Sequence, residues 1–86
     1  MKFPTSLGEV WLPNDEAVVH EWIAASHNLR IKGYASLGSE VVILREDGSI
    51  LRKGDEWPLE HAGYTYRFRI DQVIKNRVVL KAEGRE

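Results

Sequence analysis

The chain begins its regular structure with one helical pattern. The apolar residues that recur on one helix face are Val18, Val19, Trp22 and Ile23. Asn14 is a good N-terminal cap, and the acidic side chains of Asp15 and Glu16 suit the first turn of a helix. Asn28 tolerates the left-handed conformation that ends many helices. We therefore predict one helix over residues 14–27.

The segment before this helix has little apolar periodicity. It contains Pro4, Gly8 and Pro13, residue types that interrupt regular structure. We expect residues 1–13 to form an extended arm, or one short strand around Gly8–Leu12.

After the helix, the hydrophobic period changes to two, which is typical of β-strands. We predict a strand over Leu29–Tyr34, in which Gly33 marks a bulge or a close backbone approach. Its outward-facing residues are the basic Arg30 and Lys32. A loop is predicted over residues 35–40.

Two apolar runs on either side of Asp47-Gly48 predict a β-hairpin, because this dipeptide favours a tight turn. The predicted strands cover residues 41–45 and 50–53. Aliphatic side chains fall on both faces of the pair, with Val41, Ile43 and Ile50 on one face and Val42, Leu44 and Leu51 on the other. This pattern is typical of a strand pair that is covered on both sides.

The clearest alternation in the chain follows a predicted turn over 54–58 and a predicted loop over 59–63. It places Tyr64, Tyr66, Phe68 and Ile70 inward and Thr65, Arg67, Arg69 and Asp71 outward. The β-meander begins at residue 29 and is completed by Val73-Ile74, a turn at Lys75-Asn76 and a strand over 78–82. Residues 83–86 are predicted as a polar tail.

These elements predict a single domain over residues 1–86. Its class is mostly β: a small antiparallel β-sandwich or open barrel of about five or six strands with one N-terminal α-helix. The apolar content of 43% and the charged content of 29% are those of a globular protein. No apolar run reaches the roughly 20 residues of a membrane helix, and no signal peptide is visible. We expect no membrane span in this chain. The chain could be a whole protein or a fragment of a longer, membrane-anchored one.

Charge and cysteine content narrow the classes of function. The sequence has no cysteine, so disulfides and thiolate metal ligands are excluded. A net charge of −1 gives no global signature of nucleic-acid binding. The charge is uneven, however, because residues 1–28 are acidic and residues 64–86 are basic. Such asymmetry indicates either a binding face or two solvated surfaces that attract each other.

Candidate catalytic and metal-binding residues are few. His20 and His27 lie two helical turns apart, about 10 Å along the axis, which is too far to share one metal ion. His61 lies in a predicted loop, and no serine occupies a Gly-x-Ser-x-Gly motif. The glycines are scattered singly, with no phosphate-binding loop. We therefore predict no catalytic residues, no metal, no cofactor and no small-molecule substrate, and we expect that the protein is not an enzyme.

Two binding functions remain. A small SH3-like or OB-like β-barrel could bind single-stranded nucleic acid, and the basic residues available for it are Arg67, Arg69, Lys75 and Arg77. The predicted inward direction of the neighbouring aromatic residues disfavours this alternative. Protein binding is favoured, since a partner strand can add to an open sheet edge by main-chain hydrogen bonds. Leu29–Tyr34 is a candidate edge, although its basic residues equally suit an edge that blocks aggregation.

The order of several short motifs resembles a known family. The motifs are Leu29-x-Ile31-x-Gly33, Val41-Val42-Ile43, Asp47-Gly48, Lys53-Gly54-Asp55, Val78-Val79-Leu80 and Gly84-Arg85-Glu86. Over roughly residues 29–86, this series is similar to the periplasmic homology region of the inner-membrane clamp protein of type II secretion. It also resembles the related domain of the inner-membrane lipoprotein of type IV pilus assembly.

The resemblance implies a sandwich of two three-stranded antiparallel sheets that docks onto the N-terminal periplasmic domain of an outer-membrane secretin. The partner-binding residues that it indicates are Arg30, Lys32, Tyr34 and Arg45. It implies a periplasmic location, whereas without it we expect a cytoplasmic one. The chain departs from the family in its helix at 14–27, in showing no membrane anchor or lipid attachment, and in ending at Glu86, before the family's last short strand.

Overall fold

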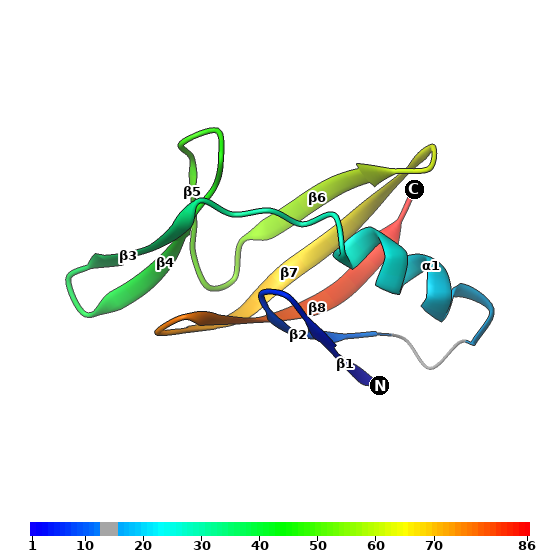
Figure 1. Cartoon of the computed structure of the whole chain (residues 1–86), viewed down its shortest axis with the longest axis horizontal. Helices are drawn as coiled ribbons and strands as arrows, with labels where there is room; N and C mark the ends of the chain where they lie inside the picture. The colour runs from blue at the N-terminus through cyan, green and yellow to red at the C-terminus, as the bar shows by residue number, and fades with distance from the viewer. Residues whose placement is uncertain (13–15) are drawn as a thin grey trace.

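The chain is mostly β in the computed structural model, which describes residues 1–12 and 16–86 (Figure 1). One helix, α1 (Glu16–Ser26), is accompanied in the described residues by eight strands. These are β1 (Lys2–Thr5), β2 (Gly8–Trp11), β3 (Gly33–Leu37), β4 (Glu40–Leu44), β5 (Ile50–Leu51), β6 (Glu56–His61), β7 (Tyr64–Ile74) and β8 (Arg77–Arg85). The predicted class, mostly β with one N-terminal helix, is confirmed, but the prediction of five or six strands was too low.

The strands form two sheets. The larger has the order β1-β2-β8-β7-β6, and the smaller has the order β3-β4-β5. All neighbouring pairs are antiparallel except β2 and β8, which are parallel. The large sheet ends in β1 on one side and β6 on the other, so it is not closed into a barrel. Five and three strands also differ from the three and three that the family resemblance implies.

The long strand β7 confirms the predicted alternation except at its first residue. Tyr66, Phe68 and Ile70 are buried, whereas Arg69 and Asp71 are exposed. The prediction that Tyr64 points into the core is wrong, since this residue is 46% exposed. It lies at the end of the sheet, where the Arg85 guanidinium, 4.2 Å from the ring centroid, covers the ring instead of the core.

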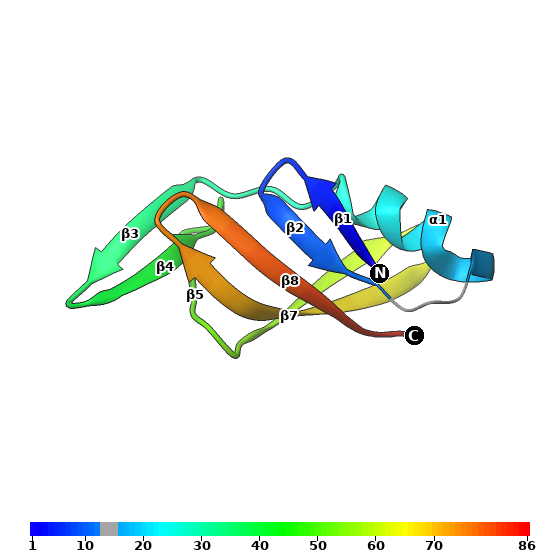
Figure 2. The ribbon, with the colours of Figure 1, turned by 90° about the horizontal axis from the view of Figure 1, so that it is seen from below.

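The helix α1 lies against one face of the large sheet (Figure 2). Trp22 holds the helix there through edge-on contacts with two aromatic rings. The centroid of its ring lies 5.0 Å from that of Tyr66 and 5.3 Å from that of Phe68. An ion pair between Glu21 and Arg85 joins the helix to β8. The predicted helix over 14–27 is confirmed over Glu16–Ser26, while the predicted cap at Asn14 and the acidic Asp15 lie outside the described residues.

The helix ends differently from the prediction. Asn28 is not in the left-handed conformation, because Ala62 is the one described non-glycine residue with a positive φ. Instead the Asn28 side-chain amide donates to the Ala24 carbonyl at 3.0 Å. The side chain therefore satisfies a carbonyl group that the end of the helix leaves free.

The N-terminal segment is a hairpin and not an extended arm. The expected strand near Gly8 is β2, but β1 pairs with it, and β2 continues the large sheet beside β8. The turn is closed by the Thr5 hydroxyl, which accepts from the backbone N–H groups of Leu7 and Gly8 at 3.2 and 3.1 Å. Pro4 is tolerated because β1 is the outermost strand, where a missing N–H costs no bond within the sheet.

The predicted strand over Leu29–Tyr34 and the predicted loop over 35–40 were also wrong. Leu29 is buried, and Ile31 packs against the same core, so the first half of this segment crosses the core without pairing as a strand. The strand β3 starts at Gly33, which pairs with Leu44, and the N–H of Lys32 donates to the Leu44 carbonyl at 2.8 Å, so two residues oppose Leu44 as in the predicted bulge. It runs through part of the predicted loop to Leu37.

Two further predicted irregular segments belong to the large sheet. Residues 56–61, predicted as parts of a turn and a loop, form β6, which tolerates Pro58 because it is the other edge strand. The predicted polar tail from Glu83 is mostly β8, in which Gly84 pairs with Arg67 and Arg85 with Tyr66. Polar residues continue this strand since its outer face is exposed to solvent.

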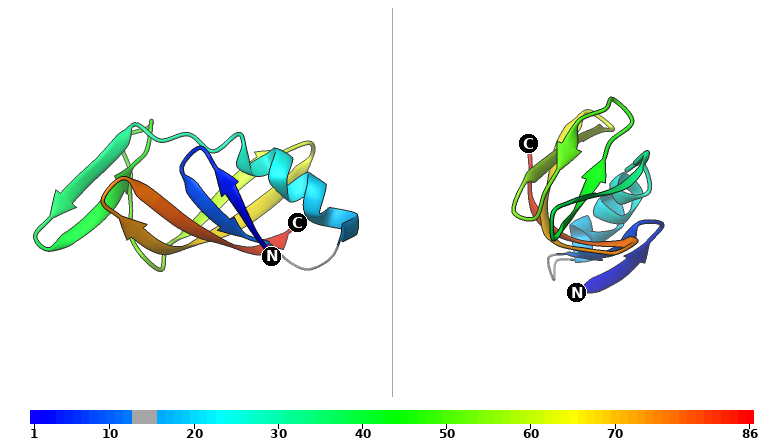
Figure 3. Two further views of the ribbon diagram at one scale, coloured as in Figure 1. Left: turned by 60° about the horizontal axis from the view of Figure 1, so that its bottom comes forward. Right: turned by 90° about the vertical axis from the view of Figure 1, so that its left-hand side faces the viewer.

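A cluster of buried side chains joins the helix and both sheets. Trp22 contributes from α1, Phe68 and Leu80 from the large sheet, and Ile43 and Leu51 from the small sheet. The molecule is nevertheless elongated, at 41 × 24 × 19 Å. The β3–β4 hairpin projects at one end, whereas α1 lies at the other (Figure 3). The small sheet is therefore the part of the structure that extends furthest from the body.

Candidate protein-binding surface

The projecting hairpin is built around a two-residue turn. Gly38 has a φ of 65° and is followed by Ser39, which has no positive φ, as in a type II′ turn. Leu37 pairs with Glu40 on either side of this turn, and the register continues without interruption to Gly33 and Leu44. The Gly-Ser dipeptide between two apolar runs is the signal in the sequence that predicts this hairpin.

One face of the small sheet packs on the core. Residues opposite each other in an antiparallel pair share a face, and the register pairs Tyr34 with Ile43 and Ile43 with Leu51. All three pack in or against the core cluster, and burial raises the pKa of Tyr34 above its usual value. This register corrects the predicted faces, because Ile43 shares its face with Leu51 and not with Ile50.

The other side of this sheet, which we call the outer face, is apolar but only partly covered. It carries Ala35, Leu37, Val42, Leu44 and Ile50, with the exposed Glu40 opposite Leu37 beside the turn. Leu37 and Ile50 are 41% and 44% exposed, whereas Val42 between them is buried outside the main core cluster. For the strand pair over 41–45 and 50–53, we predicted that both faces are covered. This prediction is wrong for the outer face. Leu37, placed in a predicted loop, was missed as a surface residue.

The four residues that the family resemblance indicates lie near the base of the projecting hairpin. Tyr34 is in β3, and Lys32 precedes this strand, with its backbone N–H donating to Leu44 at 2.8 Å. Arg30 donates to the carbonyls of His27 at 2.6 Å and Leu29 at 3.1 Å. Arg45 forms an ion pair of 3.2 Å with Asp47.

The structure brings two of these residues into one hollow. Arg30 and Arg45 both line a shallow depression of about 370 Å³ that also contains Glu46 and Asp47. The Asp47 carboxylate accepts from the Ser49 hydroxyl and N–H, which holds the pKa of Asp47 below its usual value. Tyr34 and Lys32 lie outside this hollow, so the four residues do not form one site.

The alternative nucleic-acid residues are largely neutralised by carboxylates. Arg67 pairs with Glu86 at 3.0 Å, and Arg77 pairs with Glu9 at 3.6 Å. Arg69 pairs with Glu83 and with Glu56, and its hydrogen bond lowers the pKa of Glu83. Lys75, at the β7–β8 turn, is exposed. The outer side of the large sheet therefore carries alternating charges and lacks a basic patch.

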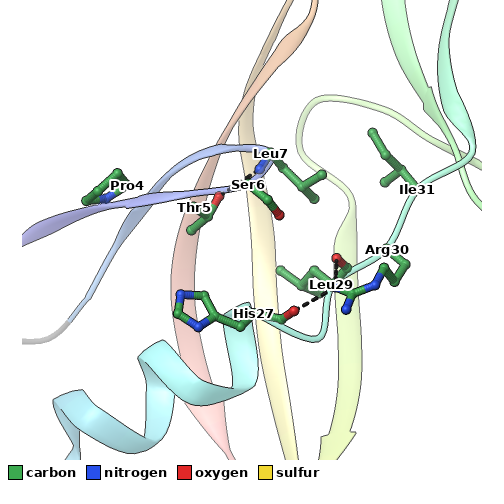
Figure 4. Close-up of a pocket in the computed structure, with 8 residues that line it drawn as sticks. All are labelled: Pro4, Thr5, Ser6, Leu7, His27, Leu29, Arg30 and Ile31. Carbon is green, nitrogen blue, oxygen red and sulfur yellow. Dashed lines mark hydrogen bonds between the residues drawn. The ribbon is translucent and has the colours of Figure 1, made fainter.

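A hollow of about 590 Å³ lies between the β1–β2 turn and the segment after α1 (Figure 4). Two of its polar side chains are engaged in the fold, because Thr5 closes the turn and Arg30 holds the carbonyls at the end of the helix. His27 is exposed on its rim.

The remaining histidines line a smaller hollow of about 250 Å³ beside Tyr64. His61 Nδ1 lies 3.2 Å from the amide nitrogen of Asn28, while His20 is exposed on α1. Across residues 1–12 and 16–86, no three side chains of His, Cys, Asp or Glu are grouped so as to hold a metal ion.

Comparison with protein-family models, with curated proteins and with solved structures gives no match for this chain. The described part of the chain contains no helix with the length and apolar character needed to cross a membrane.

Proposed function

We propose that this protein is a non-catalytic protein-binding module, and that the outer face of the small sheet is its docking surface. The observation that carries the proposal is the partly uncovered apolar face, with Leu37 and Ile50 exposed at its two ends. Exposed apolar surface of this kind marks interaction sites on soluble domains. The position at the projecting end of the molecule leaves space for a partner.

The resemblance to the secretion and pilus proteins supplies the first candidate partner. On this proposal the chain acts in a bacterial secretion or type IV pilus assembly system, in the periplasm, and docks onto the N-terminal domain of a secretin. What supports it is the order of motifs between residues 29 and 86 and the position of Lys32 and Tyr34 at the base of the hairpin that carries the outer face. A sandwich-like arrangement of the two sheets around the shared core belongs to the same proposal.

The test measures binding of purified N-terminal secretin domains to the chain by calorimetry. Leu37→Asp and Ile50→Asp each place a charge in the contact, and we expect each to weaken binding at least about tenfold, as is usual for a residue central to an interface. Trp11→Asp is the matched control, because Trp11 has a similar exposure of 46% but lies in β2 of the large sheet.

Two outcomes would contradict parts of this proposal. Binding that survives both changes on the outer face contradicts the docking surface. If no secretin domain binds, the assignment to secretion or pilus assembly is wrong.

A further inference from the structure

The open edge of β3 differs from the other sheet edges of the molecule. The edges of the large sheet, β1 and β6, carry Pro4 and Pro58, and the other edge of the small sheet, β5, has two residues. Proline, charge and short length are the usual means by which an edge avoids pairing with another chain. The five residues of β3 contain no proline and no charge, and their register with β4 has no shift from Gly33 to Leu37. This edge is unprotected.

The pairing register indicates which backbone groups face the open side. In an antiparallel pair, alternate residues exchange hydrogen bonds with the neighbouring strand, and the alternation begins with the pair that closes a two-residue turn. Counting from Leu37 and Glu40, the residues that bond toward β4 are Leu37, Ala35 and Gly33. The N–H and C=O groups of Tyr34 and Ser36 therefore point away from β4, toward solvent.

The chain just before β3 is positively charged. Lys32 is exposed and forms no ion pair within residues 1–12 and 16–86, and the Arg30 guanidinium donates to the backbone carbonyls of His27 and Leu29. The sequence has no acidic residue between Glu21 and Glu40. A strand that added to β3 would pass these two cations at one end.

We propose that β3 accepts a strand of the partner protein in antiparallel orientation, uncharged along Gly33–Leu37 and acidic where it passes Lys32 and Arg30. The inference rests on the proposed function and adds the mode and chemistry of recognition. Main-chain hydrogen bonds to Tyr34 and Ser36 provide the attachment, while the charge at one end fixes the direction and favours acidic partners.

A second copy of this chain fits the edge less well. In a two-fold pairing of β3 with itself about Ala35, Lys32 lies opposite Gly38 of the other copy. Neither Gly38 nor Ser39 provides a carboxylate. Glu40 of the other copy falls opposite Arg30, whose guanidinium already donates to the carbonyls of His27 and Leu29, so Lys32 gains no carboxylate. The charge therefore favours a different chain as the occupant.

The probe for the experiment is a synthetic peptide, acetyl-Thr-Val-Thr-Val-Thr-Glu-Glu-amide, with a second peptide in which both Glu are replaced by Lys. Amide resonances of the isotope-labelled protein are followed during titration at low salt. We expect the largest shifts at Tyr34 and Ser36, and an affinity about three- to tenfold higher for the acidic peptide, since each exposed ion pair contributes modestly.

Four variants separate the contributions. Lys32→Glu should reverse the preference between the two peptides, while Lys81→Glu, on the outer side of the large sheet, should leave it unchanged. Ser36→Pro removes one outward N–H, as Pro4 and Pro58 do at the other edges, and should abolish binding. Ser36→Ala changes the side chain alone and should retain binding. If Ser36→Pro does not fold, the reversal by Lys32→Glu decides the question.

Equal affinity for the two peptides, or shifts confined to other strands, would overturn the proposal. Self-association that Ser36→Pro abolishes would assign the edge to a second copy instead. If a secretin domain binds the Ser36→Pro and Lys32→Glu variants as tightly as the unchanged chain, strand addition to β3 is contradicted but the docking surface is not. In contrast, binding that is insensitive to Leu37→Asp and Ile50→Asp contradicts the docking surface itself.

Discussion

The turn between β6 and β7 places an alanine where the backbone favours glycine or asparagine. Ala62 and Gly63 have φ values of 51° and 83°, and the turn has two residues between His61 and Tyr64. Two successive positive φ values define a type I′ turn, in which the Cβ of alanine crowds the backbone. The sequence pattern conceals this hairpin, since Ala-Gly is a weaker turn signal than Asn-Gly.

Replacing Ala62 by asparagine should stabilise the protein. Asn adopts the left-handed conformation more readily, so we expect Ala62→Asn to raise the free energy of unfolding by about 0.5–1 kcal/mol. Urea denaturation followed by circular dichroism measures the change. Gly63→Ala is the control in the opposite direction and should lower the stability by about 1 kcal/mol. A stability unchanged in both variants would contradict the strained turn.

At the scale of the elements, the least expected feature is the parallel pair of β2 and β8. It depends on Gly8, because a Cβ at this position would overlap the carbonyl oxygen of Val78 in the neighbouring strand. The same glycine follows the β1–β2 turn that Thr5 closes. One small residue therefore permits the N-terminal hairpin to join the large sheet.

Gly8→Ala should separate this hairpin from the sheet. We expect a loss of at least about 1–3 kcal/mol in the free energy of unfolding, as is typical when extra atoms are forced into a packed site. Hydrogen exchange should also increase across β1 and β2. Gly33→Ala is the matched control, because a Cβ at Gly33 meets no atom within 4 Å. Equal effects of the two substitutions would show that close approach is not the cause.

At the scale of the whole molecule, charge is distributed as pairs between strands. The basic C-terminal third and the acidic N-terminal third meet in ion pairs such as Arg77 with Glu9 and Arg85 with Glu21. Of the two interpretations of the charge asymmetry, this favours surfaces that attract each other over a basic binding face. It also explains why the predicted nucleic-acid residues do not form a patch.

We accordingly expect at most weak binding to single-stranded nucleic acid. A labelled thirty-nucleotide oligonucleotide should show no mobility shift at about 50 mM salt with micromolar protein, because few phosphates could be neutralised by unpaired cations. Glu9→Gln, which removes the partner of Arg77, and the double change Glu56→Gln with Glu83→Gln, which removes both partners of Arg69, are the positive comparison and should increase any residual binding. Tight binding by the unchanged protein, with a steep dependence on salt, would contradict this expectation.

The sequence by itself determined the elements whose signal is local. The helix face with Trp22, the alternation of Tyr66, Phe68 and Ile70, and the turns at Asp47-Gly48 and Lys75-Asn76 were all predicted close to their observed positions. Each depends on a periodicity or a turn preference that neighbouring residues specify. The sequence also indicated that the β4–β5 hairpin carries apolar residues on both faces. One of these two faces is part of the candidate surface.

Only the tertiary structure decided which segments become edges and which faces are covered. Pro4 and Pro58 argue against strands in the sequence, yet they occur in β1 and β6, because an outermost strand loses no bond to a proline. Likewise, the core covers the face of Ile43 and leaves Leu37 and Ile50 exposed. Such outcomes depend on contacts between residues far apart in the chain, and for this reason the open edge of β3 and the outer face could be located only in the folded molecule.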